Sequence, residues 1–251
     1  PGAPAADIAA RRVPMGPTSL STRLSQRSRR IKMALLQRYL PLRGTERVLD
    51  IGSQVDTQSR QLLERFPDRS RITAVNLFPE HLETIRAAYP GIHTVQADAR
   101  KLPFPDQAFD LVYSNAVIEH VGDFKDQRAM ADEIRRCGKR WFLTTPNKWY
   151  PFEFHARLPL VSWLPPRWMH KATRMWSYNH VHGRYQPGND LSDVQLLTAR
   201  KLRQLFPDSL IVKPRVTFWP ETLVVIEPLA ADGTLPALDG VAVDTASVPA
   251  S

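Results

Sequence analysis

The chain has 251 residues, which is enough for one domain with a buried core and some appended segments. Its single cysteine, Cys137, excludes a framework of internal disulfides and fits a reducing compartment. The formal net charge of +9 is uneven, because residues 1–47 carry +8 and residues 150–185 carry +4, whereas residues 48–149 are neutral and residues 186–251 carry −3.

The N-terminal part combines a basic arm with a predicted helix. Residues 1–18 are rich in Pro, Ala and Gly, and we expect them to be disordered. The Arg- and Ser-rich segment at 11–32 superficially resembles an organelle transit peptide. However, its end merges into 29–40, where apolar residues repeat with helical spacing, so we expect a helix that packs on the domain. The basic residues are scattered among Ser and Gln without a nucleic-acid motif, so we do not expect a nucleic-acid partner.

Apolar and helical stretches then alternate along the chain. Strands are predicted at 47–51, 71–77, 93–97, 109–114 and 140–145, and helices at 57–66, 79–89 and 125–136. Runs such as Val-Leu-Asp-Ile and Ile-Thr-Ala-Val are typical of strands covered on both faces. Pro79 and Asp123 stand where helices should begin. This alternation predicts an α/β fold with a doubly wound, mostly parallel sheet.

Polar residues follow several of these strands. In open α/β sheets, ligands bind at the carboxyl ends of the strands where the strand order reverses. This rule places 51–56, Asn76, Asp98 and Asn115 around one crevice. A nicotinamide site is not expected there, because the chain lacks G-x-G-x-x-G followed by an acid about 20 residues later. With no run of 18 or more apolar residues, we expect no membrane span and a cytoplasmic location.

Residues 94–122 carry the most specific pattern, which reads TVQADARKLPFPDQAFDLVYSNAVIEHVG. It resembles the middle of a class I S-adenosylmethionine-dependent methyltransferase, in particular the type 11 group that acts on small molecules. The resemblance covers about residues 45–147. It implies a Rossmann-like seven-stranded sheet closed by an antiparallel hairpin from 210–212 and 217–228. It also implies S-adenosylmethionine as cofactor and a small or lipid-linked substrate methylated at oxygen.

The resemblance assigns roles to residues at the strand ends. Asp50 would orient the ammonium group of the cofactor, and Gly52 would let the backbone pass close to its methionine part. Asp98 would accept from the adenine amino group, and the Ala99 amide would meet a ring nitrogen. The backbone at Asn115 would lie beside the sulfonium.

Two stretches depart from the family pattern. Gly52 is usually followed by Cys-Gly-x-Gly, but here by Ser53, Gln54, Val55 and Asp56. Either the polar side chains, such as those of Ser53 and Gln54, contact the ligand, or the pocket is partly filled. Asn76, followed by Leu77, replaces the acid that commonly binds the ribose; an amide can still accept one hydroxyl and donate to another oxygen. These departures support an alternative, a degenerate methyltransferase fold that serves as a binding or partner subunit.

An aromatic-rich insertion at 148–187 follows the fifth strand and belongs to a methyltransferase domain expected at 19–228. Its nine aromatic residues fit a lid over the strand ends, a structural subdomain, or a surface element in peripheral contact with a membrane. Helical spacing returns at 194–206, and we expect residues 229–251 to be a disordered tail.

Histidines are the candidate catalytic residues. A base is needed if a hydroxyl must lose its proton, and imidazole titrates near neutrality. His120, in Ile-Glu-His-Val, occupies a position where the family often carries a histidine near the reacting centre, and His155 is the best candidate in the insertion. No residues show convincing metal-ligand spacing, since His180-Val-His182 alone is a weak signal, and we expect no metal. The substrate and the oligomeric state stay open.

Overall fold

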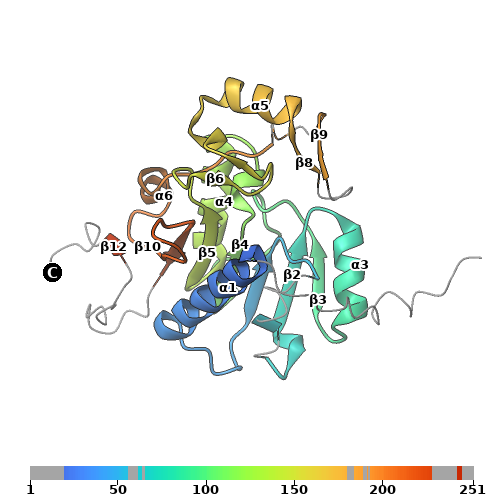
Figure 1. Cartoon of the computed structure of the whole chain (residues 1–251). Helices are drawn as coiled ribbons and strands as arrows, with labels where there is room; N and C mark the ends of the chain where they lie inside the picture. The colour runs from blue at the N-terminus through green and yellow to red at the C-terminus, as the bar shows by residue number, and fades with distance from the viewer. Residues whose placement is uncertain are drawn as a thin grey trace, which may run out of the picture.

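A computed structural model describes residues 20–55, 62–63, 66–179, 184–188, 191, 193–227 and 242–244. Its main feature is an eight-stranded sheet (Figure 1). In spatial order the strands are β12 (Ala242–Asp244), β10 (Leu210–Lys213), β11 (Thr222–Ile226), β5 (Trp141–Pro146), β4 (Leu111–Asn115), β1 (Val48–Ile51), β2 (Ile72–Asn76) and β3 (His93–Gln96).

The sheet has the predicted, mostly parallel form. Strands β3, β2, β1, β4 and β5 run parallel, and β11 pairs antiparallel with both β5 and β10. The chain leaves β1 towards β2 and β3 on one side and later adds β4 and β5 on the other, so the order reverses between β1 and β4. The eighth strand, β12, was not predicted. Residues 242–244 fall in the segment expected to be disordered, and that prediction is wrong for them because they pair with β10. The rest of that segment and residues 1–18 lie outside the described residues.

Helices cover both faces of the sheet: α1 (Leu20–Tyr39), α3 (Pro79–Ala88), α4 (Phe124–Cys137) and α6 (Ala199–Leu205). On one face, Leu36 of α1 and Ile85 of α3 pack with Val48. On the other face, Ile134 of α4 and residues of α6 pack with Leu49. Neighbouring strand residues therefore point into different cores, which explains the continuous apolar runs. Helix α1, which crosses the front of the sheet in Figure 1, starts earlier than predicted. The helix expected at 57–66 lies mostly outside the described residues.

Helix α4 begins at a capped N-terminus. Asp123 caps the helix as predicted, in a capping box with Asp126.

Further along α4, Glu133 and Arg136 bind the Leu-Pro-Phe-Pro-Asp turn at 102–106. The Leu102 amide donates to Glu133 over 2.6 Å, and Arg136 donates to the Phe104 carbonyl over 2.6 Å and to Asp106 over 2.9 Å. The turn is thus held by charge-assisted hydrogen bonds from one helix.

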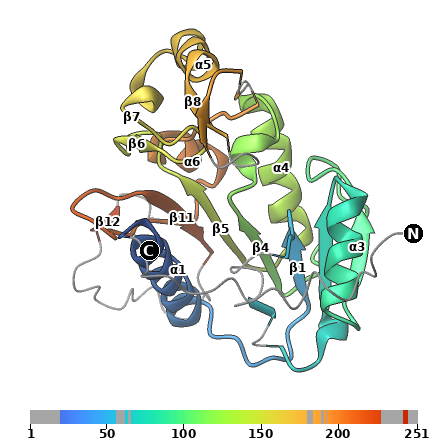
Figure 2. The same ribbon diagram turned by 45° about the vertical axis from the view of Figure 1, so that its right-hand side comes forward.

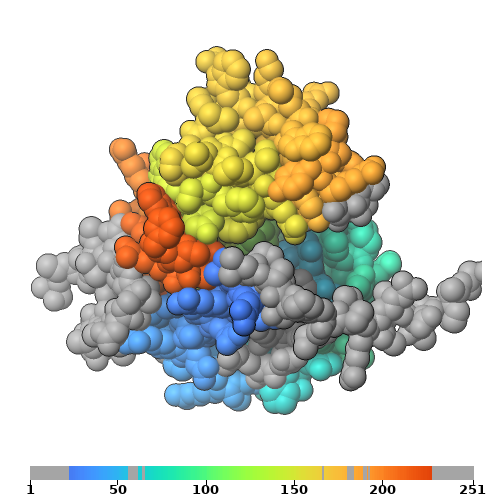
Figure 3. Space-filling model, in the orientation of Figure 1, coloured from blue at the N-terminus to red at the C-terminus, as the bar shows by residue number. Residues whose placement is uncertain are grey.

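Residues 148–187, called the cap below, form a small lobe beyond the end of β5. They contain β6 (Phe152–Glu153), β7 (Leu158–Pro159), the short helix η4 (Val161–Trp163), α5 (Pro166–Met175), β8 (Ser177–Asn179) and β9 (Arg184–Gln186). Strands β6 and β7 form one hairpin and β8 and β9 another, separate from the main sheet (Figure 2). In Figure 3 the cap protrudes as the yellow-to-orange part of the surface. None of the helices in the described part of the chain is long and apolar enough to cross a bilayer.

Candidate active site

A cavity of about 580 Å³ lies at the carboxyl ends of β1, β2, β3 and β4, where the strand order reverses. This volume is within the range of small-molecule and cofactor sites. Eight of the nine residues predicted from the sequence to bind cofactor line it: Asp50, Gly52, Gln54, Asn76, Leu77, Asp98, Ala99 and Asn115. The ninth, Ser53, is buried and is bonded to Asp50. His120 lines the same cavity, whereas His155 lies at a second one. This cavity is called the first cavity below.

Gly52 forms the turn after β1. Its φ of +75° is in the left-handed region that disfavours side chains. A β-carbon there would lie 2.2 Å from Cγ2 of Val117, which also lines the first cavity. Both the backbone conformation and the close approach of β1 to the loop after β4 therefore require glycine.

The altered loop after Gly52 is tied down by polar side chains. The Ser53 hydroxyl donates to Asp50 over 2.6 Å, and the Asn76 side-chain amide donates to the Ser53 carbonyl over 2.9 Å. The Asn76 side-chain carbonyl accepts from the Phe78 amide over 3.0 Å. Ser53 and Asn76, one from each of the two departing stretches, are therefore bonded to each other, while Gln54 lines the first cavity. Asp56 lies outside the described residues.

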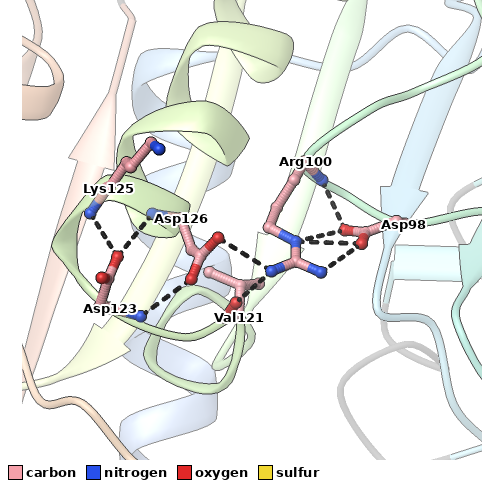
Figure 4. A network of polar contacts seen from close by, with 6 residues as sticks. All are labelled: Asp98, Arg100, Val121, Asp123, Lys125 and Asp126. Atoms are coloured by element: carbon pink, nitrogen blue, oxygen red, sulfur yellow. Dashed lines mark hydrogen bonds and ion pairs between the residues drawn. The ribbon is translucent and has the colours of Figure 1, made fainter.

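Asp98, at the end of β3, belongs to an ion-pair network (Figure 4). Both of its carboxylate oxygens accept from the Arg100 guanidinium, at 2.6–3.0 Å. Arg100 also donates to Asp126 of the α4 capping box over 2.9 Å. The hydrogen bonds from Arg100 hold the pKa of Asp98 below its ordinary value. The Arg100 backbone amide also donates to Oδ1 of Asp98 over 2.9 Å. Each carboxylate oxygen thus already accepts two hydrogen bonds from Arg100, so a ligand amino group would have to replace one of them.

A second cavity, of about 870 Å³, lies between α1, the end of β5 and the cap. Aromatic residues of the cap line it, as do the basic residues Arg29, Lys32 and Arg157. Ala116 lines both cavities. Its φ of +54° is uncommon for a residue with a side chain, and its amide donates to the Thr144 carbonyl over 2.8 Å. The two cavities therefore meet at a strained residue directly after β4.

Polar groups gather where the cavities meet. The side-chain carbonyl of Asn115 accepts from the Thr144 hydroxyl over 2.6 Å and from the Lys32 ammonium over 3.4 Å. Helix α1 thus brings a cation to the carboxyl end of β4.

The two candidate catalytic histidines, 35 positions apart in the sequence, lie together. The rings of His120 and His155 have centroids 5.0 Å apart in an edge-to-face arrangement. Nδ1 of His155 is 2.6 Å from buried Glu153, and Nδ1 of His120 is 3.5 Å from Asp193. Glu119, fully buried next to His120, accepts from the Thr145 hydroxyl over 2.8 Å.

Burial and neighbouring charges shift the pKa values in this cluster. Burial raises the pKa of Glu119. Burial alone would lower the pKa of His155, but its hydrogen bond to Glu153 and the negative charge of Glu153 outweigh burial and raise it. The same hydrogen bond overcomes the effect of burial on Glu153 and lowers the pKa of that carboxyl. The pair therefore favours imidazolium next to carboxylate.

Sequence reasoning did not select several residues at this site: Lys32, Arg100, Ala116, Glu119 and Asp193. Glu119 and Ala116 lie within the recognisable motif, so their positions in it were a usable signal. Lys32 and Asp193 come from distant segments, and only the fold brings them to the site.

Comparison with known proteins agrees with this geometry. The family model of a methyltransferase domain matches residues 49–140. A malonyl-[acyl-carrier protein] O-methyltransferase of Halorhodospira halophila is 35% identical over 99 residues, which are 38% of this chain and 33% of the relative. A trans-aconitate 2-methyltransferase of Escherichia coli is 34% identical over 105 residues, 42% of this chain and 40% of the relative. The chain therefore matches only about a third to two-fifths of the length of these relatives.

Solved structures support the same fold. An S-adenosylmethionine-dependent methyltransferase of Methanosarcina mazei superposes with a TM-score of 0.52 at 17% identity, covering 76% of this chain and 95% of that one. A Pyrococcus horikoshii protein gives a TM-score of 0.51 at 15% identity, covering 84% and 93%. At these identities the likeness shows the fold alone. Residues 49–140 therefore match the methyltransferase-domain family, and the described part of the chain has the fold of class I methyltransferases.

Proposed function

We propose that the chain transfers the methyl group of S-adenosylmethionine, bound in the first cavity, to an oxygen of a small or lipid-linked acceptor in the second cavity. The observation that carries this proposal is the meeting of the two cavities at Ala116. Methyl transfer is an in-line displacement, so the acceptor oxygen must approach the methyl carbon opposite the sulfur. Two cavities that share a lining residue would bring the two reactants next to each other, which supports this arrangement.

The groups around the first cavity support this place for the cofactor. Asp50 would orient the ammonium group, and the backbone at Gly52 would pass close to the methionine part. Asp98 and the Ala99 amide would bind adenine, and the Asn115 backbone would lie beside the sulfonium. Asn76, whose amide is bonded to the loop, would support the ribose through the loop rather than through a charged hydrogen bond.

The second cavity favours an acceptor with an apolar body and an anionic group. Arg29, Lys32 and Arg157 supply positive charge there, and Tyr150 and Phe154 supply apolar surface. The named acceptors of the two relatives, malonyl-acyl-carrier protein and trans-aconitate, both carry carboxylates. A carboxylate is already ionised at neutral pH and attacks the methyl carbon without a base.

A hydroxyl acceptor would need a base, and His155 or His120 would supply it. The hydroxyl proton moves to the imidazole as the carbon–oxygen bond forms and the carbon–sulfur bond breaks, which releases S-adenosylhomocysteine. Glu153 favours His155 in this role because it orients the ring and stabilises the imidazolium.

The outer surface of the cap supports contact with a membrane that presents a lipid-linked acceptor. Its exposed aromatic residues include Trp149, Trp163, Trp168 and Trp176. Arg167 and Lys171 of α5 lie over the Trp168 ring, and the only acid in the cap, Glu153, is buried. Tryptophan prefers the headgroup level of a bilayer, and basic side chains bind anionic lipids. Contact through this surface would leave the first cavity accessible to cofactor.

Calorimetry with S-adenosylmethionine and S-adenosylhomocysteine tests the central claim. The wild-type chain should bind both, and methyl transfer from labelled cofactor to a carboxylic acid panel should follow. Ala116→Val should retain cofactor binding but reduce transfer at least tenfold, because a β-branched residue resists this φ and narrows the junction. Ala116→Gly, which relieves the strain, is the matched control and should retain transfer. Absence of cofactor binding at millimolar concentration would instead favour the degenerate fold acting as a partner subunit.

A further inference from the structure

We propose that Glu119, His120 and His155 form a binding site for one divalent transition-metal ion, such as Zn²⁺, between the two cavities. One carboxylate oxygen and one nitrogen from each ring all lie within 4.8 Å of one another. Tetrahedral zinc ligands lie about 3.3 Å apart, as follows from metal–ligand distances of about 2.0–2.1 Å. His120 is exposed, so its side chain has room to close the remaining gap.

The carboxylate of Glu119 supplies the first argument for a cation. It is fully buried, and only one of its oxygens has a partner, the Thr145 hydroxyl. The other oxygen, Oε1, is buried with no hydrogen-bond donor in the described part of the chain. A buried carboxylate must be neutralised or matched by positive charge. A metal ion bound by all three groups would satisfy Oε1.

The surroundings of the histidines supply the second argument. Histidines that bind metals usually donate their other ring N–H to a carboxylate, which fixes the ring and strengthens the ligand. Here Nδ1 of each ring faces a carboxylate, Glu153 for His155 and Asp193 for His120. Three carboxylates around two imidazoles suit a dication. Together with Thr145 of β5, the groups of this cluster come from four separate parts of the chain.

The ligand set indicates the kind of metal. Two imidazoles and one carboxylate suit Zn²⁺, Fe²⁺ or Co²⁺ rather than Ca²⁺ or Mg²⁺, which prefer oxygen ligands. Three protein ligands leave a further position open, as in catalytic rather than structural zinc sites. The open position would lie near the junction at Ala116, where the proposed function brings the acceptor oxygen. In the metal-bound state the histidines would hold the ion, and the ion would lower the pKa of a bound hydroxyl.

Metal titration of the full chain tests this inference without any assay of activity. After treatment with a chelator, the chain should bind one Zn²⁺ by calorimetry and elemental analysis. Bound Co²⁺ should give visible d–d absorption of four- or five-coordinate type. His120→Ala, His155→Ala and Glu119→Gln should each lower the affinity at least 100-fold. His81→Ala/His93→Ala, which removes two histidines of α3 and β3, is the control and should bind like wild type.

Further variants show whether the ion binds at these three residues or elsewhere on the chain. Glu153→Gln should weaken binding by about 10-fold while leaving one ion per chain, because it loosens a ligand without removing it. Circular dichroism of each variant checks that it is folded. Because His120 is exposed, His120→Ala should disturb the fold least of the three substitutions. If Zn²⁺ does not bind to wild type, or if binding is lost with His180→Ala/His182→Ala and kept with His120→Ala, the inference is overturned. Because the readout is metal binding, its failure is distinct from a failure of methyl transfer.

Discussion

Gly52 shows how one residue sets the shape of the first cavity. Replacing it with alanine should destabilise the chain by more than the 1–2 kcal/mol expected for a left-handed non-glycine residue, because the new β-carbon would collide with Val117. Thermal unfolding should therefore show a clear loss, together with weaker binding of S-adenosylhomocysteine.

Gly188 provides a matched control for this prediction. It also has a positive φ, +100°, but an added β-carbon would meet no atom within 4 Å. Gly188→Ala should therefore lower the stability only by the amount expected for a non-glycine residue at a positive φ. Val117→Ala added to Gly52→Ala should recover part of the loss. Equal shifts in melting temperature for Gly52→Ala and Gly188→Ala would contradict the collision.

For the substitution Asn76→Asp, the sequence and the structure predict opposite effects on cofactor affinity. From the sequence, Asn76→Asp should hold or improve cofactor affinity, because it restores the acid usual for ribose binding. In the structure, however, the Asn76 amide donates to the Ser53 carbonyl over 2.9 Å, and a carboxylate would place an oxygen against that carbonyl. We expect Asn76→Asp to lower both stability and S-adenosylhomocysteine affinity, by about 1–3 kcal/mol in stability.

Asn76→Ala, which removes the side-chain amide without adding charge, separates the two contributions at this position. It should cost less than Asn76→Asp, as measured by calorimetry and urea unfolding. Tighter cofactor binding by Asn76→Asp would mean that the loop rearranges to free this side chain for the ribose.

At the scale of elements, α4 holds two segments at the edge of the first cavity. Its first turn binds Arg100 through Asp126, and Arg100 in turn binds Asp98 (Figure 4). Its last turns bind the 102–106 turn through Glu133 and Arg136. One amphipathic helix therefore positions both the end of β3 and the loop that leads to β4.

Glu133→Gln tests the second of these contacts. The hydrogen bond from Arg136 holds the pKa of Glu133 below its ordinary value of 4.5, and the side chain is only 17% exposed. A carboxylate with a lowered pKa in the folded state stabilises the fold above the unfolded pKa and loses that effect as the pH falls through the folded pKa. The variant should therefore be less stable at neutral pH by about 1–2 kcal/mol.

The difference between wild type and Glu133→Gln should narrow as the pH falls below about 4.5. Urea unfolding at neutral and acidic pH measures it. Glu83→Gln, on the exposed side of α3, is the control and should change stability little at either pH. A gap that stays constant with pH would show that the charge of Glu133 does not contribute.

At the scale of the whole molecule, the charge is concentrated away from the neutral sheet. The cap carries exposed tryptophans beside basic residues, and it protrudes from the surface in Figure 3. We expect the chain to bind vesicles of phosphatidylcholine with phosphatidylglycerol more tightly than vesicles of phosphatidylcholine alone. Binding should weaken with salt, because screening reduces attraction to the lipid headgroups.

Two charge-reversal variants test whether the cap is the surface that binds the vesicles. Arg167→Glu/Lys171→Glu on α5 should weaken sedimentation with anionic vesicles at least tenfold, since each basic residue near the surface contributes about 1 kcal/mol. Arg86→Glu/Lys101→Glu changes the net charge equally but outside the cap, and it should bind like wild type. If both variants lose binding equally, net charge rather than the cap is responsible.

The sequence by itself determined the sheet, because its evidence is local. Continuous apolar runs indicate strands buried on both faces, and the alternation with helices indicates a doubly wound order. The motif around Asp98 and the glycine at position 52 then located the first cavity, since carboxyl ends of parallel strands meet at one edge. The 242–244 strand was missed because three residues in a polar, Pro- and Gly-containing tail give no periodic signal.

Only the tertiary structure decided what lies around that cavity. Lys32 reaches Asn115 across 83 positions, and Asp193 reaches His120 across a similar separation. His155 faces His120 because the cap lies beyond the end of β5, next to the loop that follows β4. Metal-ligand spacing along the chain therefore could not reveal the cluster with Glu119. The physical reason is that these contacts depend on packing between distant segments, whereas sequence periodicity records only which face of its own element a residue occupies.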